Sequence, residues 1–148
     1  NSGTCYDLTL IDQVKDVNGN VILDNHAKVR NKVNIANSTW KAVHNGMYRV
    51  VNGSRSSIGS MFSGMKVKIA GKTGTAQQSK LHANHAYFVS YAPYKNPEIS
   101  VTCVIPNGFT SSNAAQTARD VYKYYFSKNK KKVSGKIKMP ESNTTHTD

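Results

Sequence analysis

Residues 69–78 read IAGKTGTAQQ, and the chemistry of the chain depends on how this stretch is divided. Read as A-G-K-T (70–73), it matches the end of a phosphate-binding P-loop, in which a glycine-rich turn holds a nucleotide. Read as K-T-G-T (72–75), it matches one wall of a serine acyl-transfer site. The two interpretations require different neighbours in the sequence, so the surrounding residues separate them.

A P-loop requires the pattern G-x-x-x-x-G-K-[ST], whose first glycine stands five residues before the second. Five residues before Gly71 the chain has Lys66, and the nearest upstream glycine, Gly64, leaves six residues between the two glycines. A P-loop also follows a strand and opens a helix. Here an alternating apolar pattern runs into the motif, and another strand pattern comes after it. We therefore reject nucleotide binding at this stretch.

The start of the chain has the pattern of a β-hairpin. Tyr6, Leu8 and Leu10 alternate with polar residues, which is typical of a half-buried strand. Asn18-Gly19 follows, a pair preferred in tight hairpin turns because both residues accept a positive φ. The sequence predicts a β-hairpin over residues 5–23.

Helices are expected before and after the motif. Asn37 or Ser38 is a suitable N-cap, and the apolar residues that follow recur at helical spacing for about four turns. Ser111 or Ser112 can cap a second helix, whose alanine and tyrosine residues form one apolar stripe. Such a stripe indicates that the second helix covers one face of a sheet.

Three strand patterns lie between the two helices, over residues 67–71, 87–91 and 99–105. Connections this short favour an antiparallel meander, since parallel crossovers need a dozen or more residues. The expected fold class is therefore α+β, an antiparallel sheet with flanking helices. We expect residues 1–126 to form one structural unit and residues 127–148 to form a basic, disordered tail.

The K-T-G-T interpretation gives each residue a chemical reason. A cationic Lys72 beside a serine nucleophile favours its deprotonation and stabilises the negative charge of the intermediate. Thr73 can hydrogen-bond a carboxylate, and Gly74 lets a peptide-like substrate lie against the strand. Alternation places Lys72 and Gly74 on one face and Thr73 and Thr75 on the other. We therefore expect a twist or bulge at the glycine that lets both sets reach one cleft.

Four longer strings carry a family resemblance: WKAVHNGMYRVV (40–51), MKVKIAGKTGTAQ (65–77), NHAYFVSYAP (84–93) and PEISVTCVI (97–105). Together they resemble the C-terminal part of the transpeptidase domain of class B penicillin-binding proteins. The resemblance covers about residues 1–126. It is greatest to the elongation-specific penicillin-binding protein 2 type, with the division-type paralogue close behind.

The resemblance implies roles for four residues. Lys72 would act in the proton-transfer and electrostatic network around the catalytic serine. Thr73 and Thr75 would bind the carboxylate of the terminal D-Ala or of a β-lactam, and Gly74 would let the substrate lie against the strand. The backbone N–H of Thr75 would be one of two oxyanion-hole donors, the other coming from the serine itself.

The family also requires a Ser-x-x-Lys nucleophile and a Ser-x-Asn motif, both well before K-T-G. Ser-x-x-Lys occurs at three places in this chain, at Ser38/Lys41, Ser63/Lys66 and Ser127/Lys130. None has the right context, and the Ser-x-Asn matches at residues 111–113 and 127–129 come after K-T-G. We expect a fragment of a D,D-transpeptidase that lacks its nucleophile and is inactive alone, with Ser38 the first serine to test otherwise.

Two other functional classes stay open. A β-lactam sensor or resistance receptor shares K-T-G and differs only in upstream sequence. A basic nucleic-acid-binding module would use the net charge of +12, but the positive charge lies partly in the tail and shows no stripe interleaved with aromatic residues, so we expect no nucleic acid partner.

No cofactor and no metal is expected. His82 and His85 have no neighbouring Cys or carboxylate to complete a metal shell, and they are interpreted as loop residues flanking a strand. Cys5 and Cys103 have no metal-ligand spacing, and a disulfide between them stays open.

The expected partners follow from the resemblance. They are the acyl-D-Ala-D-Ala stem peptide of peptidoglycan, β-lactams, and the missing N-terminal part of the same domain. The parent protein would be membrane-anchored and act on the extracytoplasmic face of the bacterial membrane. This chain has no apolar run of about 18 residues.

Overall fold

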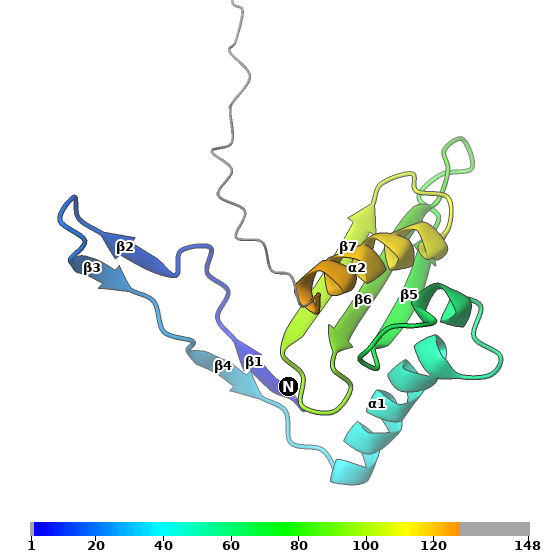
Figure 1. The fold of residues 1–148 in the computed structure, drawn as a ribbon, viewed down its shortest axis with the longest axis horizontal. Coiled ribbons are helices and arrows are strands. Elements are labelled where there is room, and N and C mark those ends of the chain that lie inside the picture. Colours follow the sequence, from blue (N-terminus) through cyan, green and yellow to red (C-terminus); the bar gives the residue numbers. More distant parts are fainter. Residues whose placement is uncertain (1, 128–148) are drawn as a thin grey trace, which may run out of the picture.

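A three-stranded antiparallel sheet forms the centre of the computed structural model, which describes residues 2–127 (Figure 1). Its strands are β5 (Ala70–Ala76), β6 (His85–Ala92) and β7 (Ile99–Ile105), in the spatial order β5-β6-β7. Each strand pairs with the next one along the chain, so the predicted antiparallel meander is confirmed. The first strand begins three residues later than the alternation predicted, at Ala70 instead of residue 67.

Helix α2 (Ser111–Tyr125) packs across one face of this sheet. Its buried stripe is Ala114, Ala115, Ala118 and Tyr122. The stripe meets the inward side chains of β6, where Phe88 is fully buried, and the Tyr122 hydroxyl donates to Ser90 Oγ at 2.9 Å. Burial raises the pKa of the Tyr122 phenol, because it penalises the charged form.

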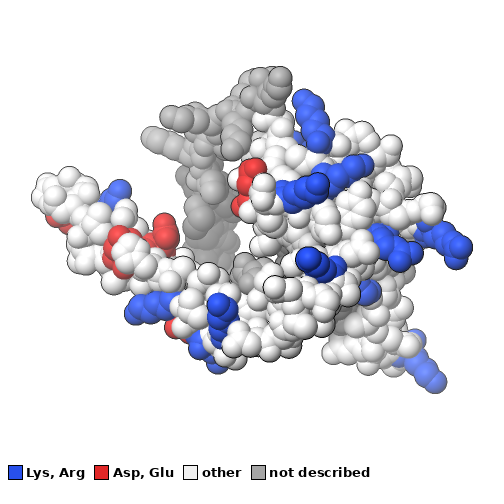
Figure 2. All heavy atoms as spheres, turned by 90° about the horizontal axis from the view of Figure 1, so that it is seen from below, with Lys and Arg blue, Asp and Glu red and all other residues white. Residues whose placement is uncertain are grey.

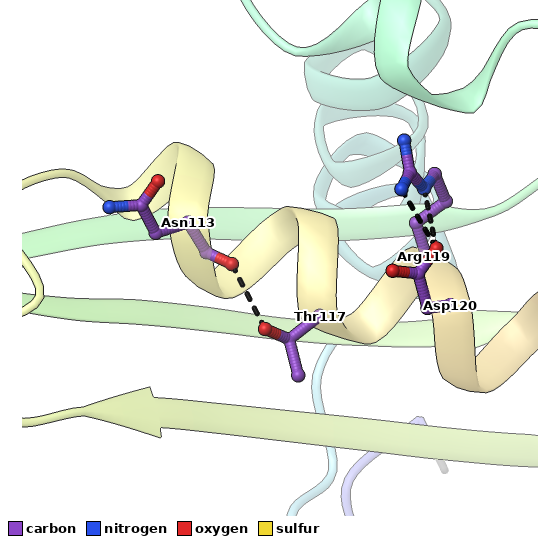
Figure 3. A network of polar contacts seen from close by, with 4 residues as sticks. All are labelled: Asn113, Thr117, Arg119 and Asp120. Carbon is purple, nitrogen blue, oxygen red and sulfur yellow. Dashed lines mark hydrogen bonds and ion pairs between the residues drawn. The ribbon is translucent and has the colours of Figure 1, made fainter.

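Several polar contacts of α2 are local. The N-cap is Thr110, whose side chain accepts from the Ser112 backbone N–H, and not Ser111 or Ser112 as the sequence predicted. On the outer side Thr117 Oγ1 donates to the Asn113 carbonyl at 3.1 Å, and Arg119 pairs with Asp120 at 2.8 Å (Figure 3). The burial of the inner stripe, and not these surface contacts, therefore fixes the helix on the sheet.

Helix α1 (Asn37–Asn52) packs beside β5, and the short 3-10 helix η1 (Gly59–Phe62) follows it. The helix begins after Ala36, which makes no side-chain cap, so the predicted capping by Asn37 or Ser38 is wrong. At the other end, Asn52 Nδ2 donates to the Ile69 carbonyl at 2.8 Å. This bond joins the end of α1 to the residue before β5.

Residues 2–35 form a long two-stranded ribbon, which extends away from residues 36–127, here called the compact part (Figure 1). Strand β1 (Thr4–Tyr6) pairs with β4 (Val29–Lys32), and β2 (Gln13–Lys15) pairs with β3 (Val21–Asp24). The predicted hairpin therefore exists, but it ends at residue 32 and its first half is interrupted. Leu8 and Leu10 are fully exposed and outside any strand, so the predicted half-buried strand there is wrong.

The turn of the ribbon is longer than Asn18-Gly19 predicts. The last pair of the ladder is Lys15 with Val21, and only Gly19 has a positive φ, at 88°. The Asp16 carboxylate accepts from the backbone N–H groups of Asn18 and Asn20 and from the Asn20 side chain, each at 2.8 Å. These bonds, chiefly those from Asn20, lower the pKa of Asp16 and stabilise a five-residue loop in place of a two-residue turn.

The observed mixture of antiparallel strands and helices confirms the α+β prediction. Cys5 and Cys103 are both free thiols, the first exposed and the second half-buried. Within residues 2–127 no helix is long and apolar enough to cross a membrane. The predicted disordered tail lies outside the described residues from position 128 onward.

Candidate functional site

Strand β5 carries K-T-G-T at the edge of the sheet. Within the described part of the chain it pairs on one side only, with β6, and its other edge faces α1, η1 and solvent. An edge strand presents unpaired backbone N–H and C=O groups. The strand can therefore pair with an extended peptide without breaking any existing ladder bond.

The two faces of β5 are distinguished by its glycines. A Cβ at Gly71 would lie 2.6 Å from Phe88 Cζ, and a Cβ at Gly74 would lie 3.3 Å from Tyr87 Cβ. Since residues two apart share a face, Thr73 and Thr75 lie on the buried Phe88 side and Lys72 on the Tyr87 side. The register is unbroken from Ala70 to Ala76, so the bulge expected at the glycine is absent.

Lys72 is exposed, and its Nζ donates to the Thr73 carbonyl at 2.6 Å. No carboxylate pairs with this ammonium among the described residues. The positive charge is thus held close to the strand and remains available to an incoming anion or to a hydroxyl group.

Thr73 is half-buried and faces a pocket of about 680 Å³ beside the edge of β5. The other walls are the end of α1 and the loop over residues 53–57, which contribute Arg49 and Arg55. A larger pocket of about 720 Å³ lies beside His44 and Tyr91, but none of residues 72–75 lines it. Of these two pockets, the one beside Thr73 is therefore the one relevant to the motif.

Thr75 is exposed and lies next to the start of α2. Its Oγ1 accepts from the backbone N–H of Ser111 at 3.4 Å, a long contact between residues 36 positions apart. The Ser-x-Asn match at residues 111–113 is thus brought close to K-T-G, which the sequence alone did not indicate. Asn113 points its amide elsewhere, donating to the Gly108 carbonyl at 2.8 Å.

His85 is the first residue of β6 and stands opposite Ala76, the last residue of β5. Its two ring nitrogens contact Gln78 and Asn107, at 2.8 and 3.0 Å. The sequence interpretation placed His85 in a loop, and the structure corrects this. No spacing rule identifies such a residue, because both of its partners come from connections whose course the sequence does not specify.

The three Ser-x-x-Lys matches remain scattered. Ser38 is exposed in the first turn of α1, Ser63 follows η1 directly, and Ser127 is the last described residue. Within residues 2–127 none of them makes a hydrogen bond to Lys72, whose ammonium donates to the Thr73 carbonyl. No group of three or more His, Cys, Asp or Glu that could hold a metal occurs within residues 2–127.

A comparison with models of protein families identifies the family to which this edge strand belongs. Residues 1–123 match the model described as the penicillin binding protein transpeptidase domain. The chain belongs to this family. Its relatives place it among class B proteins of the penicillin-binding protein 2 type, as the resemblance indicated.

Two curated relatives illustrate the match. The chain is 40% identical over 103 residues to peptidoglycan D,D-transpeptidase MrdA of Haemophilus influenzae, covering 60% of this chain and 16% of the relative. It is 38% identical over 102 residues to penicillin-binding protein 2B of Streptococcus pneumoniae, covering 64% and 15%. The chain therefore spans about a sixth of the length of the curated relatives that it matches.

Solved structures agree on the fold. Pseudomonas aeruginosa penicillin-binding protein 2, in complex with WCK 5153, superposes with a TM-score of 0.61 at 33% identity, over 73% of this chain and 24% of the other. Streptococcus pneumoniae penicillin-binding protein 2B from strain R6 gives 0.63 at 31% identity, over 78% and 21%. These two penicillin-binding proteins thus share the fold of this chain over about three quarters of its length.

Proposed function

We propose that this chain is the C-terminal part of the transpeptidase domain of a peptidoglycan D,D-transpeptidase, and that residues 72–75 form one wall of its acyl-transfer site. The observation that carries the proposal is the position of K-T-G-T on an open edge strand, inside the segment that matches the transpeptidase family. The domain would occupy residues 1–126, with residues 127–148 forming a basic tail.

In the reaction, the acyl group of acyl-D-Ala-D-Ala is transferred to a serine hydroxyl, which forms an ester and releases D-Ala. The ester then passes the acyl group to an amine of a neighbouring stem peptide and frees the serine. Lys72 would stabilise negative charge near the serine and participate in proton transfer, since its ammonium has no carboxylate partner in the described chain. The missing N-terminal part of the domain would supply that serine.

The remaining residues of the motif would bind the acyl-D-Ala-D-Ala stem peptide that donates the acyl group. Thr73 and Thr75, on the opposite face of β5 from Lys72, would hydrogen-bond the terminal carboxylate of a peptide that lies along the open edge between the two faces, and the backbone N–H of Thr75 would donate to the oxyanion. Gly74 would leave space for the substrate on the Tyr87 side of the strand, because a Cβ at this position would lie only 3.3 Å from Tyr87 Cβ. An extended peptide could then pair with the open edge of β5.

β-Lactams would occupy the same wall. The Pseudomonas aeruginosa relative was solved in complex with WCK 5153, and penicillin-binding protein A of Mycobacterium tuberculosis as an imipenem acyl-enzyme complex. The second likeness, at 20% identity, supports the fold alone. As a member of the penicillin-binding protein transpeptidase family, the parent protein would be acylated by β-lactams and would act, membrane-anchored, on the extracytoplasmic face of the cell membrane.

A fluorescent penicillin tests the proposal in the full-length protein that contains this chain. We expect a covalent adduct on a denaturing gel and an acylation rate about 100-fold lower in Lys72→Ala, the loss typical of one acid–base or charge-stabilising group. Lys68→Ala, another exposed lysine just before β5, is the matched control and should leave the rate unchanged. A full-length protein that forms no adduct with the fluorescent penicillin would contradict the proposal.

The same reagent tests the expected inactivity of the isolated chain. Residues 1–148 alone should form no adduct, since none of the three Ser-x-x-Lys serines contacts Lys72. An adduct on the isolated chain would show that a nucleophile is present after all, and Ser38→Ala would then be the first variant to examine.

A further inference from the structure

His85 has a defined proton position because of its two hydrogen-bond partners. The backbone N–H of Asn107 can only donate, so His85 Nδ1, 3.0 Å away, must accept and be unprotonated. The hydrogen of the neutral ring is then on Nε2, which donates to Gln78 Oε1 at 2.8 Å. Both bonds are satisfied by one tautomer, and the ring is fixed at both ends.

The two partners belong to the two connections at this end of the sheet. Gln78 lies in the connection from β5 to β6, and Asn107 in the connection from β7 to α2. The second connection contains two non-glycine residues in the left-handed region, Asn107 at φ 52° and Phe109 at φ 63°. Such residues are sterically unfavourable and persist only where their surroundings hold them.

Two of the hydrogen bonds that hold this connection come from residues at the start of β6. His85 accepts from the Asn107 N–H, and the neighbouring Asn84 carbonyl accepts from the Phe109 N–H at 3.0 Å. Beyond them the connection reaches Ser111, whose N–H points at Thr75 Oγ1. On the other side, Gln78 is only three residues after Thr75. The His85 contacts therefore lead to Thr75 by two routes, along the chain from Gln78 and through space from the connection that ends at Ser111.

We propose that His85 is a positioning residue for the acyl-transfer site, which it serves by holding the end of β5 and the start of α2 on either side of Thr75. This inference rests on the proposed function, because Thr75 is the residue expected to bind the carboxylate and to donate to the oxyanion. His85 itself touches neither substrate nor nucleophile, so it acts only through the two connections.

The test uses the full-length protein and separates the acylation rate constant from the dissociation constant of the preceding non-covalent complex with a fluorescent penicillin. In His85→Ala we expect the rate constant to fall about tenfold, the effect of losing two neutral hydrogen bonds that place a transition-state donor. The dissociation constant should change less than the rate constant, whereas general loosening of the fold would weaken both.

Two conservative variants each keep one of the two hydrogen bonds of His85. In His85→Asn the side-chain oxygen takes the place of Nδ1 and retains the bond from Asn107, and in His85→Gln the amide takes the place of Nε2 and retains the bond to Gln78. Each should recover part of the rate lost in His85→Ala. His82→Ala is the matched control. His82 lies in the connection that contains Gln78, its ring makes no hydrogen bond to residues 2–127, and the variant should be acylated at the wild-type rate.

The outcomes separate the two proposals. If wild-type protein is not acylated, the proposed function is wrong and the role of His85 falls with it. If the wild type is acylated and His85→Ala is acylated at the same rate, only the role of His85 is wrong. A low rate in His85→Ala with no recovery in either conservative variant would also overturn it, since the loss would then reflect general damage.

Discussion

The ribbon and the central sheet have similar alternation of apolar and polar residues, but only the sheet is covered by a helix, α2. Leu10 of the ribbon is 106% exposed, whereas Phe88 of β6 is 0% exposed beneath α2. The alternating sequence of residues 6–10 forms no strand beyond Tyr6, and that of residues 99–105 forms β7. The same alternation thus leads to a strand at residues 99–105, where a second layer covers the sheet, and to none beyond Tyr6 at residues 6–10, where no second layer within residues 2–127 does.

The ribbon and the compact part also differ in charge. The ribbon has four Lys or Arg and four Asp, while the compact part has ten Lys or Arg and two acidic residues. In the view of Figure 2 the basic side chains are spread over the compact part, and acidic side chains gather on the ribbon. The compact part therefore contributes most of the positive charge within residues 2–127.

The difference in burial predicts the largest effect. Phe88→Ala should lower the free energy of unfolding by about 3–5 kcal/mol, because it removes a fully buried aromatic side chain. Leu10→Ala should change it by no more than about 0.5 kcal/mol, as for most exposed positions. Urea unfolding followed by circular dichroism measures both, and equal midpoints would contradict the comparison.

The root of the ribbon predicts an intermediate effect. Gly3 has φ 87°, and a Cβ there would lie 2.4 Å from the Val33 carbonyl oxygen and 2.7 Å from Trp40 Cζ2. Gly3→Ala should therefore separate β1 from β4, at a local cost of about 1–3 kcal/mol, and accelerate amide exchange at Val33 without affecting β6.

Gly19 provides the matched control for Gly3. It has nearly the same φ, 88°, but a Cβ there would meet nothing within 4 Å. Gly19→Ala should cost only the strain of the left-handed conformation, about 1 kcal/mol. If the two variants exchange equally at Val33, the close packing at the root does not hold the ribbon.

The buried phenol predicts the smallest effect, and it depends on pH. The pKa of Tyr122 is raised in the folded state, so its contribution to stability is complete below the usual tyrosine value of about 10 and is lost as the pH rises above it. Tyr122→Phe should cost about 1 kcal/mol at neutral pH through the lost bond to Ser90, and should abolish part of the alkaline decline.

Thermal unfolding between pH 8 and about pH 11 measures this decline, a range chosen to include the tyrosine pKa. Tyr124→Phe, on the exposed side of the same helix, should keep the wild-type pH dependence. A Tyr122→Phe protein with an unchanged alkaline decline would show that another group is responsible.

Local patterns predicted the sheet because three short connections left few alternatives. The order of strands and the final helix followed from residues 67–125, where apolar positions at a spacing of two and then of about four lie close together. The ribbon was predicted less well. Asn18-Gly19 indicated a tight turn, but the Asp16 carboxylate has three donors within reach and stabilises a longer one.

The candidate site could be located but not assembled from the sequence. Lys72, Thr73, Gly74 and Thr75 are contiguous, so their place on a strand was predictable. Ser111 and His85 approach them only through tertiary contacts, the first 36 residues away from Thr75. Long-range hydrogen bonds of this kind depend on loop conformations, among them the positive φ of Asn107 and Phe109, that no local pattern encodes.

The two glycines of β5 limit how this strand can vary. At Gly71 a methyl group would collide with Phe88, and at Gly74 it would press on Tyr87. The strand thus has no spare volume on either face at these positions, while its other edge has no strand partner within residues 2–127. Mutational change can remodel the pocket through the side chains at 72, 73 and 75 or through whatever lies along the edge, but not by thickening the strand itself.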